Sequence, residues 1–224
     1  MWKIVWMRKR KVAEFQEKHV YNIPIFTFND AKKAFDLSEL CDEIEDQIPF
    51  KLFKNIEVIY IGTFEKLNGR TALYADNAIY IDFNKDNPMT TVEYLENIIH
   101  EIAHSLEEDY SHFVFRQDLV NEFKGKRERL MHLLKGEGHT INPILFYNTD
   151  YNAEFDDFLA NKVGYPLLLS LTMGLFVSPY GATSLQEYFA NGFEKYFLDG
   201  PETVKSTSPV LYRKIVGVLS GDAD

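Results

Sequence analysis

Cysteine is almost absent from this chain of 224 residues, because Cys41 is the single one. A single cysteine excludes an intramolecular disulfide and any cysteine-rich metal site. Basic residues are also scarce: 24 lysines and arginines stand against 34 aspartates and glutamates, which gives a net charge of −10. Such a charge argues against a general nucleic-acid-binding protein, since neutralising phosphates requires a basic surface. We therefore expect a protein of a reducing compartment without a nucleic-acid partner.

Long hydrophobic runs are missing as well. No stretch of about 18 apolar residues occurs, so we expect no membrane span. The longest apolar stretch, residues 165–181, is interrupted by polar residues and is typical of a buried helix. The apolar residues of MWKIVW at the start are too few for a signal peptide. We expect a cytoplasmic protein, or one released without a classical signal; phage-encoded and virion-associated proteins belong to this class.

The charge is distributed unevenly along the chain. Residues 1–11 contain five basic residues and no acidic one, whereas the rest of the chain carries a net charge of −15. No internal repeat, low-complexity tract or Gly/Ser-rich linker divides the sequence, so we expect one domain over residues 1–224. Its expected parts are a basic segment with a helix (1–54), a sheet with a motif-bearing helix (55–110), a helical insert (111–177) and a C-terminal helical part (178–224).

Hydrophobic spacing predicts an α+β fold, with a small sheet followed by helices. Apolar residues at helical intervals predict a helix over residues 30–47 that packs Cys41 and ends before Pro49. Runs rich in β-branched and aromatic residues predict strands at 57–62, 71–75 and 77–83. The sequence ADNA between the last two predicts a tight turn and a hairpin. From about residue 112 onward the spacing is almost wholly helical.

Two later helices have recognisable starts. Thr90 followed by Glu93 forms a capping box, in which each side chain can bind a free amide at the start of the helix. Thr183 and Gln186 form a second pair of this kind. Behind the first cap the spacing predicts a buried stripe made of Val92, Leu95, Ile99, Ala103 and Leu106.

The first capped helix contains an H-E-x-x-H motif, from His100 through Glu101 to His104. Four residues make slightly more than one helical turn, so both imidazoles project from one face and can share an ion. Glu101 lies on the flank of that face, within reach of a metal-activated water. Zinc suits two imidazoles and one carboxylate, and it leaves a fourth position open for water. The alternative is an exposed helix that carries two histidines by coincidence.

A third ligand has to come from elsewhere in the chain. The metzincin class would require a glycine at position 107 and a histidine at position 110, where this chain has Glu107 and Tyr110. That class is therefore excluded. The remaining histidines are more typical of surface or hydrogen-bonded residues: His19, His112, His132 and His139.

Downstream carboxylates are the better candidates for the third ligand. Glu187 stands early on a largely aromatic helix, where a carboxylate without a partner is costly, and this favours it. Glu154 is an alternative whose neighbours, Asp156 and Asp157, are typical of a solvated pair or of groups that orient a ligating imidazole. Glu194, two turns after Glu187, is a weaker third candidate.

Two segments together resemble a known family. HEIAH (100–104), followed by acidic residues and Tyr110, and SPYGATSLQEYFANGFEKYF (178–197) are similar to the lethal factor-like zinc metallopeptidases, which include the small Pro-Pro endopeptidases. The resemblance covers roughly residues 55–110 and 178–215. It implies a zincin-like domain of the gluzincin type.

The resemblance also implies roles for individual residues. His100, His104 and Glu187 would bind Zn²⁺, Glu101 would act as the general base, and Tyr180 would lie beside the substrate carbonyl. The strand at 77–83 would be the edge strand along which zincins bind an extended peptide.

One departure from the family concerns length. The 82 residues between His104 and Glu187 are about twice the number expected for the compact members, so residues 111–177 resemble an insert. This departure keeps Glu154 open as an alternative ligand.

The sequence therefore favours a zinc-dependent endopeptidase acting on a peptide or protein substrate. An alternative is a structural or adaptor protein of a larger assembly, such as a phage particle or toxin complex, that keeps a zincin fold. In that case the insert 111–177 or the basic start would dock a protein partner. Zinc-dependent hydrolysis of a non-peptide bond ranks last, because an edge strand favours an extended polypeptide.

Overall fold

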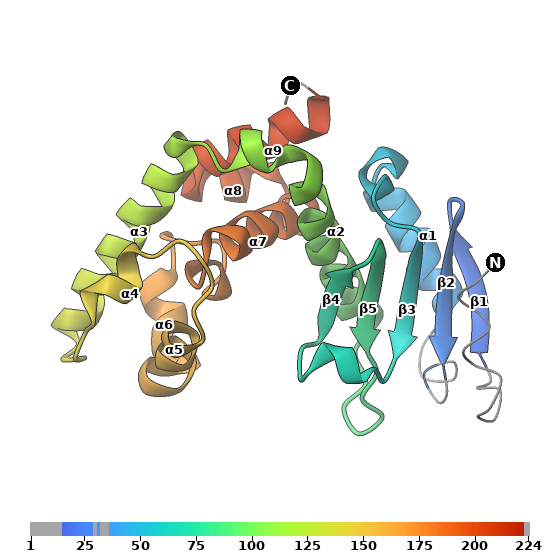
Figure 1. Cartoon of the computed structure of the whole chain (residues 1–224), viewed down its shortest axis with the longest axis horizontal. Coiled ribbons are helices and arrows are strands. Elements are labelled where there is room, and N and C mark those ends of the chain that lie inside the picture. Colours follow the sequence, from blue (N-terminus) through green and yellow to red (C-terminus); the bar gives the residue numbers. More distant parts are fainter. Residues whose placement is uncertain (1–14, 29–30, 32–35, 222–224) are drawn as a thin grey trace. The chain divides into compact units, whose positions relative to one another are not determined.

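The computed structural model describes residues 15–28, 31 and 36–221. The basic segment 1–11 and most of the first seven residues of the helix expected at 30–47 lie outside this part. The described chain is α+β, with a five-stranded mixed sheet followed by a mostly helical half, as the sequence predicts (Figure 1). Two compact units form, Met1–Ser105 (the sheet unit) and Leu106–Asp224 (the helical unit). Their boundary falls inside one continuous helix, and the single domain over 1–224 stays a prediction.

The sheet has the strand order β1-β2-β3-β5-β4. Its strands are β1 (Phe15–Val20), β2 (Ile23–Phe28), β3 (Val58–Gly62), β4 (Ala72–Ala75) and β5 (Ala78–Asp82). The pairs β1–β2 and β4–β5 are antiparallel, whereas β3 runs parallel to both β2 and β5. The last three strands match the expected ones within a residue at each end. The first two were not predicted.

The hairpin between β4 and β5 confirms the tight turn. Asp76 and Asn77 have φ angles of 53° and 58°. Positive φ at both central residues of a two-residue loop defines a type I′ turn, whose twist matches that of the flanking strands.

The expectation that the strand at 77–83 is an edge strand is wrong. β5 lies between β3 and β4, so both of its backbone edges are paired. The hairpin turn returns β4 along one side of β5, while β3 occupies the other side as a parallel neighbour. The edge strand at this end of the sheet is therefore β4.

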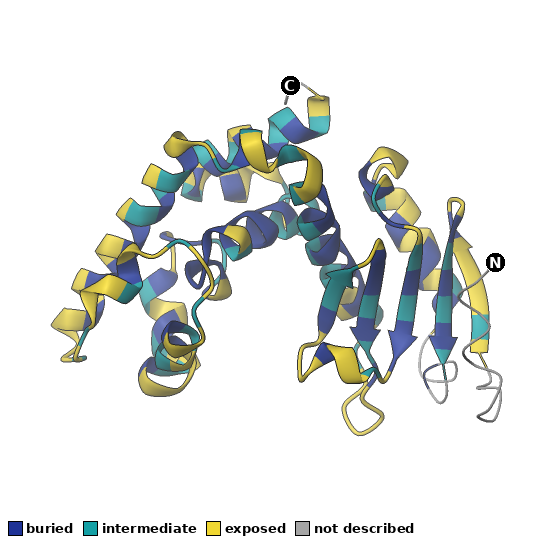
Figure 2. Cartoon of the chain, viewed as in Figure 1, coloured by how far each residue is buried: buried dark blue, intermediate teal, exposed yellow. Residues whose placement is uncertain are grey.

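One face of the sheet forms the core of the sheet unit. The buried side chains on this face include Ile25, Ile59, Ile61, Ile79 and Ile81. Helices α1 (Leu37–Gln47) and α2 (Thr91–Val114) lie along it, and buried and half-buried residues alternate along the strands (Figures 1 and 2). Two short 3₁₀ helices, η3 (Phe50–Phe53) and η4 (Glu65–Leu67), complete the unit. Cys41 is buried within α1, as expected.

The start of α2 confirms the capping box. The Thr90 backbone N–H donates to the Glu93 carboxylate at 2.7 Å, and the Glu93 N–H donates to the Thr90 hydroxyl at 3.2 Å. The predicted buried stripe is correct from Leu95 onward. Val92 is 59% exposed, because it lies in the first turn, before the helix meets the core.

The helical unit contains the end of α2 and a series of shorter helices. These are α3 (Gln117–Gly136), α4 (Pro143–Tyr147), α5 (Ala153–Asp157), the π-helix η5 (Phe158–Gly164), α6 (Tyr165–Thr172), η6 (Tyr180–Ala182), α7 (Leu185–Leu198), α8 (Pro201–Thr207) and α9 (Pro209–Ser220). The almost wholly helical character expected beyond residue 112 is confirmed.

The apolar stretch 165–181 is less buried than expected. Tyr165 is 61% exposed and Met173 is 79% exposed, whereas Leu168 and Phe176 are buried. The helix in this stretch is α6, which has eight residues. Its buried residues, Leu168 and Thr172, are one turn apart, so one side of the helix packs and the other faces outward. In the described part of the chain, no helix combines the length and apolarity that crossing a membrane requires.

Candidate metal centre

The two histidines of the motif lie one turn apart on α2. Their Nε2 atoms are 3.2 Å apart, and both side chains are partly exposed. Two imidazole nitrogens that share a tetrahedral zinc at about 2.0–2.1 Å would lie about 3.3 Å from each other. The spacing of His100 and His104 therefore already matches that of two ligands of one ion.

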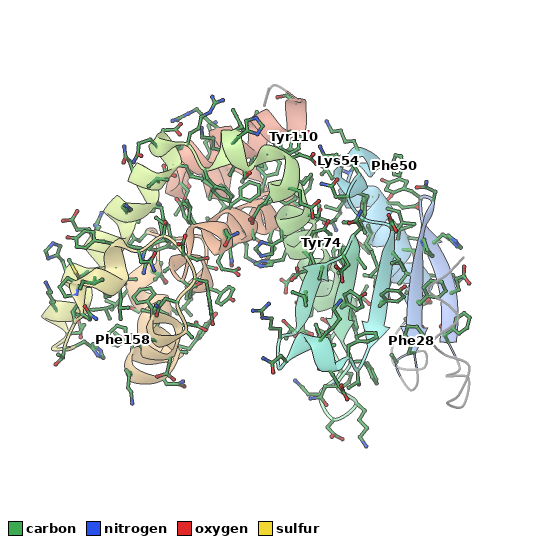
Figure 3. The ribbon with its side chains drawn as sticks, viewed as in Figure 1. Phe28, Phe50, Lys54, Tyr74, Tyr110 and Phe158 are labelled. Atoms are coloured by element: carbon green, nitrogen blue, oxygen red, sulfur yellow. The ribbon has the colours of Figure 1, made fainter. Side chains whose placement is uncertain are left out.

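Glu101 is held by the edge strand of the sheet. It is 7% exposed, and its Oε2 accepts a hydrogen bond of 2.6 Å from the backbone N–H of Tyr74. Tyr74 lies on β4 and is labelled in Figure 3. A carboxylate that accepts a backbone N–H keeps a fixed orientation. Asn55 supports the same region, because its side chain donates to the Ser105 carbonyl at 2.8 Å and its carbonyl accepts the Tyr74 hydroxyl at 3.2 Å.

Glu187 stands in the first turn of α7. The N-cap of this helix is Ser184, whose hydroxyl accepts the Glu187 N–H at 3.1 Å. The expected cap at Thr183 and Gln186 is therefore wrong by one residue. Thr183 still belongs to the preceding turn, since its hydroxyl donates to the Tyr180 carbonyl at 2.8 Å.

Asn191 ties Glu187 to the segment that carries Tyr180. Its side-chain NH₂ donates to the Glu187 carbonyl at 2.8 Å, and its Oδ1 accepts the Ser178 hydroxyl. Ser178 in turn accepts the Gly181 N–H at 3.2 Å. The amide of Asn191, 5% exposed, thus joins α7 to the turn that contains Tyr180.

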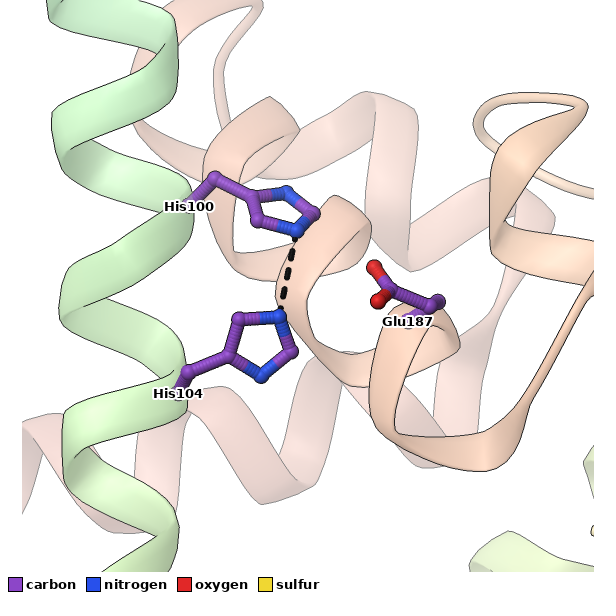
Figure 4. Close-up of side chains that lie close together, drawn as sticks. All are labelled: His100, His104 and Glu187. Carbon is purple, nitrogen blue, oxygen red and sulfur yellow. Dashed lines mark hydrogen bonds between the residues drawn. The ribbon is translucent and has the colours of Figure 1, made fainter. Parts of the chain in front are cut away.

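The start of α7 also contacts the second half of α2. Gln186 donates to the Glu107 carboxylate at 2.8 Å, and Glu107 follows His104 by three residues on the same helix. Within the described residues, His100, His104 and Glu187 form a group whose candidate ligand atoms all lie within 4.8 Å of one another (Figure 4). Two imidazoles and a carboxylate are a ligand set that zinc accepts.

The other candidate ligands have different surroundings. Glu154 is exposed at the start of α5. The Asp156 carboxylate accepts the Tyr151 hydroxyl at 2.9 Å, and that of Asp157 accepts the Asn161 amide at 2.8 Å. Glu194 lies 3.4 Å from the Lys195 ammonium. These four carboxylates are not in the group that contains Glu187.

Tyr180 and the remaining histidines complete the set of sequence candidates. Tyr180 opens η6 and its side chain is 44% exposed, so its place beside a substrate carbonyl stays a prediction. His139 lies edge-on to the Phe158 ring, with the ring centroids 6.2 Å apart. The others are exposed, as expected: His19, His112 and His132.

Sequence reasoning missed the residues that support the centre. Tyr74 acts through its backbone N–H, which no residue type reveals. Asn191 follows Glu187 by four residues on one helix, and this spacing could have indicated a side-chain bond to the Glu187 carbonyl. Tyr188 donates to Glu122, which lies 66 residues earlier in the chain, and no local sequence pattern indicates this pair.

Comparisons with protein-family models, with curated proteins and with solved structures found no match to this chain.

Proposed function

We propose that this protein is a zinc-dependent endopeptidase with a zincin-like fold of the lethal factor type. His100, His104 and Glu187 would hold the metal. The observation that carries the proposal is that three candidate ligand atoms lie within 4.8 Å of one another, two from the H-E-x-x-H motif on α2 and one from Glu187 on α7. Each imidazole and the carboxylate offers a donor that zinc prefers, and three protein ligands leave one position open.

Bound zinc would supply a Lewis acid that makes water nucleophilic near neutral pH and polarises a carbonyl. Glu101 would accept the proton of the attacking water and pass it to the leaving amine. The N–H of Tyr74 donates to one carboxylate oxygen of Glu101 and so orients the side chain for this role. The Tyr180 hydroxyl would donate a hydrogen bond to the oxyanion that develops on the substrate.

The edge of the sheet supports an extended polypeptide as the substrate. The backbone N–H of Asp82 donates to the Thr71 carbonyl at 2.8 Å. Along an antiparallel pair, the backbone groups of successive residues point alternately towards the partner strand and away from it. The backbone groups of Ala72 and Tyr74 therefore point away from β5, and on this side the Tyr74 N–H donates to Glu101. A peptide that adds to this edge would lie directly beside Glu101.

Metal analysis and peptide cleavage test the proposal together. The purified protein should contain one zinc per chain. Glu101→Gln should retain this zinc and lose turnover by at least about a hundredfold, because only the proton acceptor is removed. Cleavage would be followed with a library of extended peptides.

The matched control compares the two candidate third ligands. Glu187→Ala should lose zinc, whereas Glu154→Ala should keep it. The opposite pattern would move the third ligand to Glu154. A wild-type protein without affinity for zinc would favour the structural or adaptor role instead.

A further inference from the structure

Tyr188, the residue after Glu187, anchors α7 inside the helical unit. Its side chain is fully buried, and its hydroxyl donates to the Glu122 carboxylate on α3 at 3.0 Å. Consecutive residues of a helix project about 100° apart, so fixing Tyr188 also fixes the rotation of Glu187 about the helix axis.

Glu122 connects three helices with one carboxylate. Besides the Tyr188 hydroxyl, it accepts the backbone N–H groups of Val210 at 2.8 Å and Leu211 at 3.0 Å. These amides belong to the first turn of α9, where free N–H groups favour a negative charge. Glu122 therefore joins α3, α7 and α9.

A buried lysine one turn further along α3 strengthens the same junction. Lys126 is 8% exposed, and its ammonium donates to the Thr207 carbonyl at 2.7 Å and to the Ser208 hydroxyl at 3.1 Å. It also donates to the Leu175 carbonyl. A buried charge is retained at little cost only when it is hydrogen-bonded in this way. These directional hydrogen bonds fix how α3 packs against the segments that contain Leu175 and Thr207.

We propose that Glu122 is a positioning residue for the metal centre, which acts on the ligand Glu187 through Tyr188. This inference rests on the proposed zinc site. It gives a role to the long segment between the two metal-binding motifs: α3 is the support against which the third-ligand helix is set. Groups that orient a metal ligand typically change metal affinity about 10–100-fold when they are removed.

The test uses two variants that keep the size and shape of the side chain. Tyr188→Phe removes the hydroxyl and keeps the ring, and Glu122→Gln keeps the size of the side chain and removes its charge. Zinc affinity would be measured by competition with a chromophoric chelator. Both variants should bind zinc about tenfold more weakly than the wild type, and the double variant should lose little more than either.

Asp118→Asn is the matched control. Asp118 also lies on α3 and pairs with Lys214 of α9 at 2.9 Å, so it links two of the same helices through a different pair of side chains. Its side chain is 51% exposed, and zinc affinity should stay within about twofold of the wild type. Unchanged affinity in both Tyr188→Phe and Glu122→Gln would overturn the inference. An equal loss in Asp118→Asn would do the same, because it would indicate general loosening.

A second readout does not depend on the metal. In metal-free protein, hydrogen exchange of the backbone amides at 184–191 should become faster in Tyr188→Phe and Glu122→Gln than in Asp118→Asn. Wild-type protein that fails to bind zinc would refute the proposed function. Unchanged exchange in both variants would refute the positioning role, so the two failures can be told apart.

Discussion

At the scale of single residues, side chains form hydrogen bonds with backbone groups around the candidate metal centre. Glu101 binds the Tyr74 N–H, and Asn191 binds the Glu187 carbonyl. In the helical unit, the buried guanidinium of Arg127 lies 4.1 Å from the Phe155 ring centroid and donates to the carbonyls of Leu145 and Asn148. A single arginine therefore connects the end of α4 to α5, because its guanidinium binds two carbonyls of the first and packs against a ring of the second.

Cys41 provides a prediction about pH and stability. Burial raises the pKa of its thiol to about 11, from an ordinary value of 9.0, and the nearby carboxylates of Glu45 and Asp42 act in the same direction. Between these two pH values the folded protein keeps the thiol proton while the unfolded chain loses it. The stabilising contribution is therefore complete below pH 9 and is lost as the pH rises towards 11.

The comparison of wild type with Cys41→Ala isolates this contribution. The free energy of unfolding, measured in urea, should fall more for the wild type than for the variant between pH 8.5 and about 11. An equal fall in both proteins would show that the thiol has the same pKa in the folded and unfolded states.

Only some residues of the candidate metal centre can be recognised from the sequence. His100, Glu101 and His104 are recognisable because one helical turn brings them together, so their relation is local. Glu187 is favoured by the cost of a carboxylate on an aromatic helix, but its meeting with the histidines depends on packing over 82 intervening residues. The backbone N–H of Tyr74 is beyond sequence reasoning, because every residue except proline has one.

At the scale of elements, strong local signals are confirmed and weak ones fail. The type I′ turn and the Thr90–Glu93 capping box depend on neighbouring residues alone. β1 carries charged, exposed residues as an edge strand does, and Pro24 interrupts the β signal of β2, so neither strand was predicted. The edge position of β4 instead of β5 depends on which strand pairs with β3, and local pattern does not contain that information.

The hairpin that carries Tyr74 can be tested through its turn. Asn77 has a φ of 58°, a conformation in which a Cβ atom costs about 1–2 kcal/mol unless a local polar side chain compensates. Asn77→Ala should lower the free energy of unfolding by about 1 kcal/mol, whereas Asn77→Gly should leave it equal or higher. Urea denaturation of the two variants measures the difference. Equal stabilities of the alanine and glycine variants would contradict the assigned turn.

At the scale of the whole molecule, the proposed function gives the long helical stretch between His104 and Glu187 a role. Within this stretch α3 supplies Glu122 to the junction with α7 and α9. The sequence indicates the helices of this stretch through their hydrophobic spacing. It does not indicate their partners, because contacts between side chains more than 60 residues apart leave no periodic signal.

The proposed function requires that His100, His104 and Glu187 bind one zinc ion. Crystals of the zinc-loaded protein, measured on both sides of the zinc absorption edge, test it most directly. The anomalous difference map should contain one strong peak, with Nε2 of each histidine and a carboxylate oxygen of Glu187 at about 2.0–2.2 Å. A map without a peak at these residues, or with Glu154 in place of Glu187, would contradict the account.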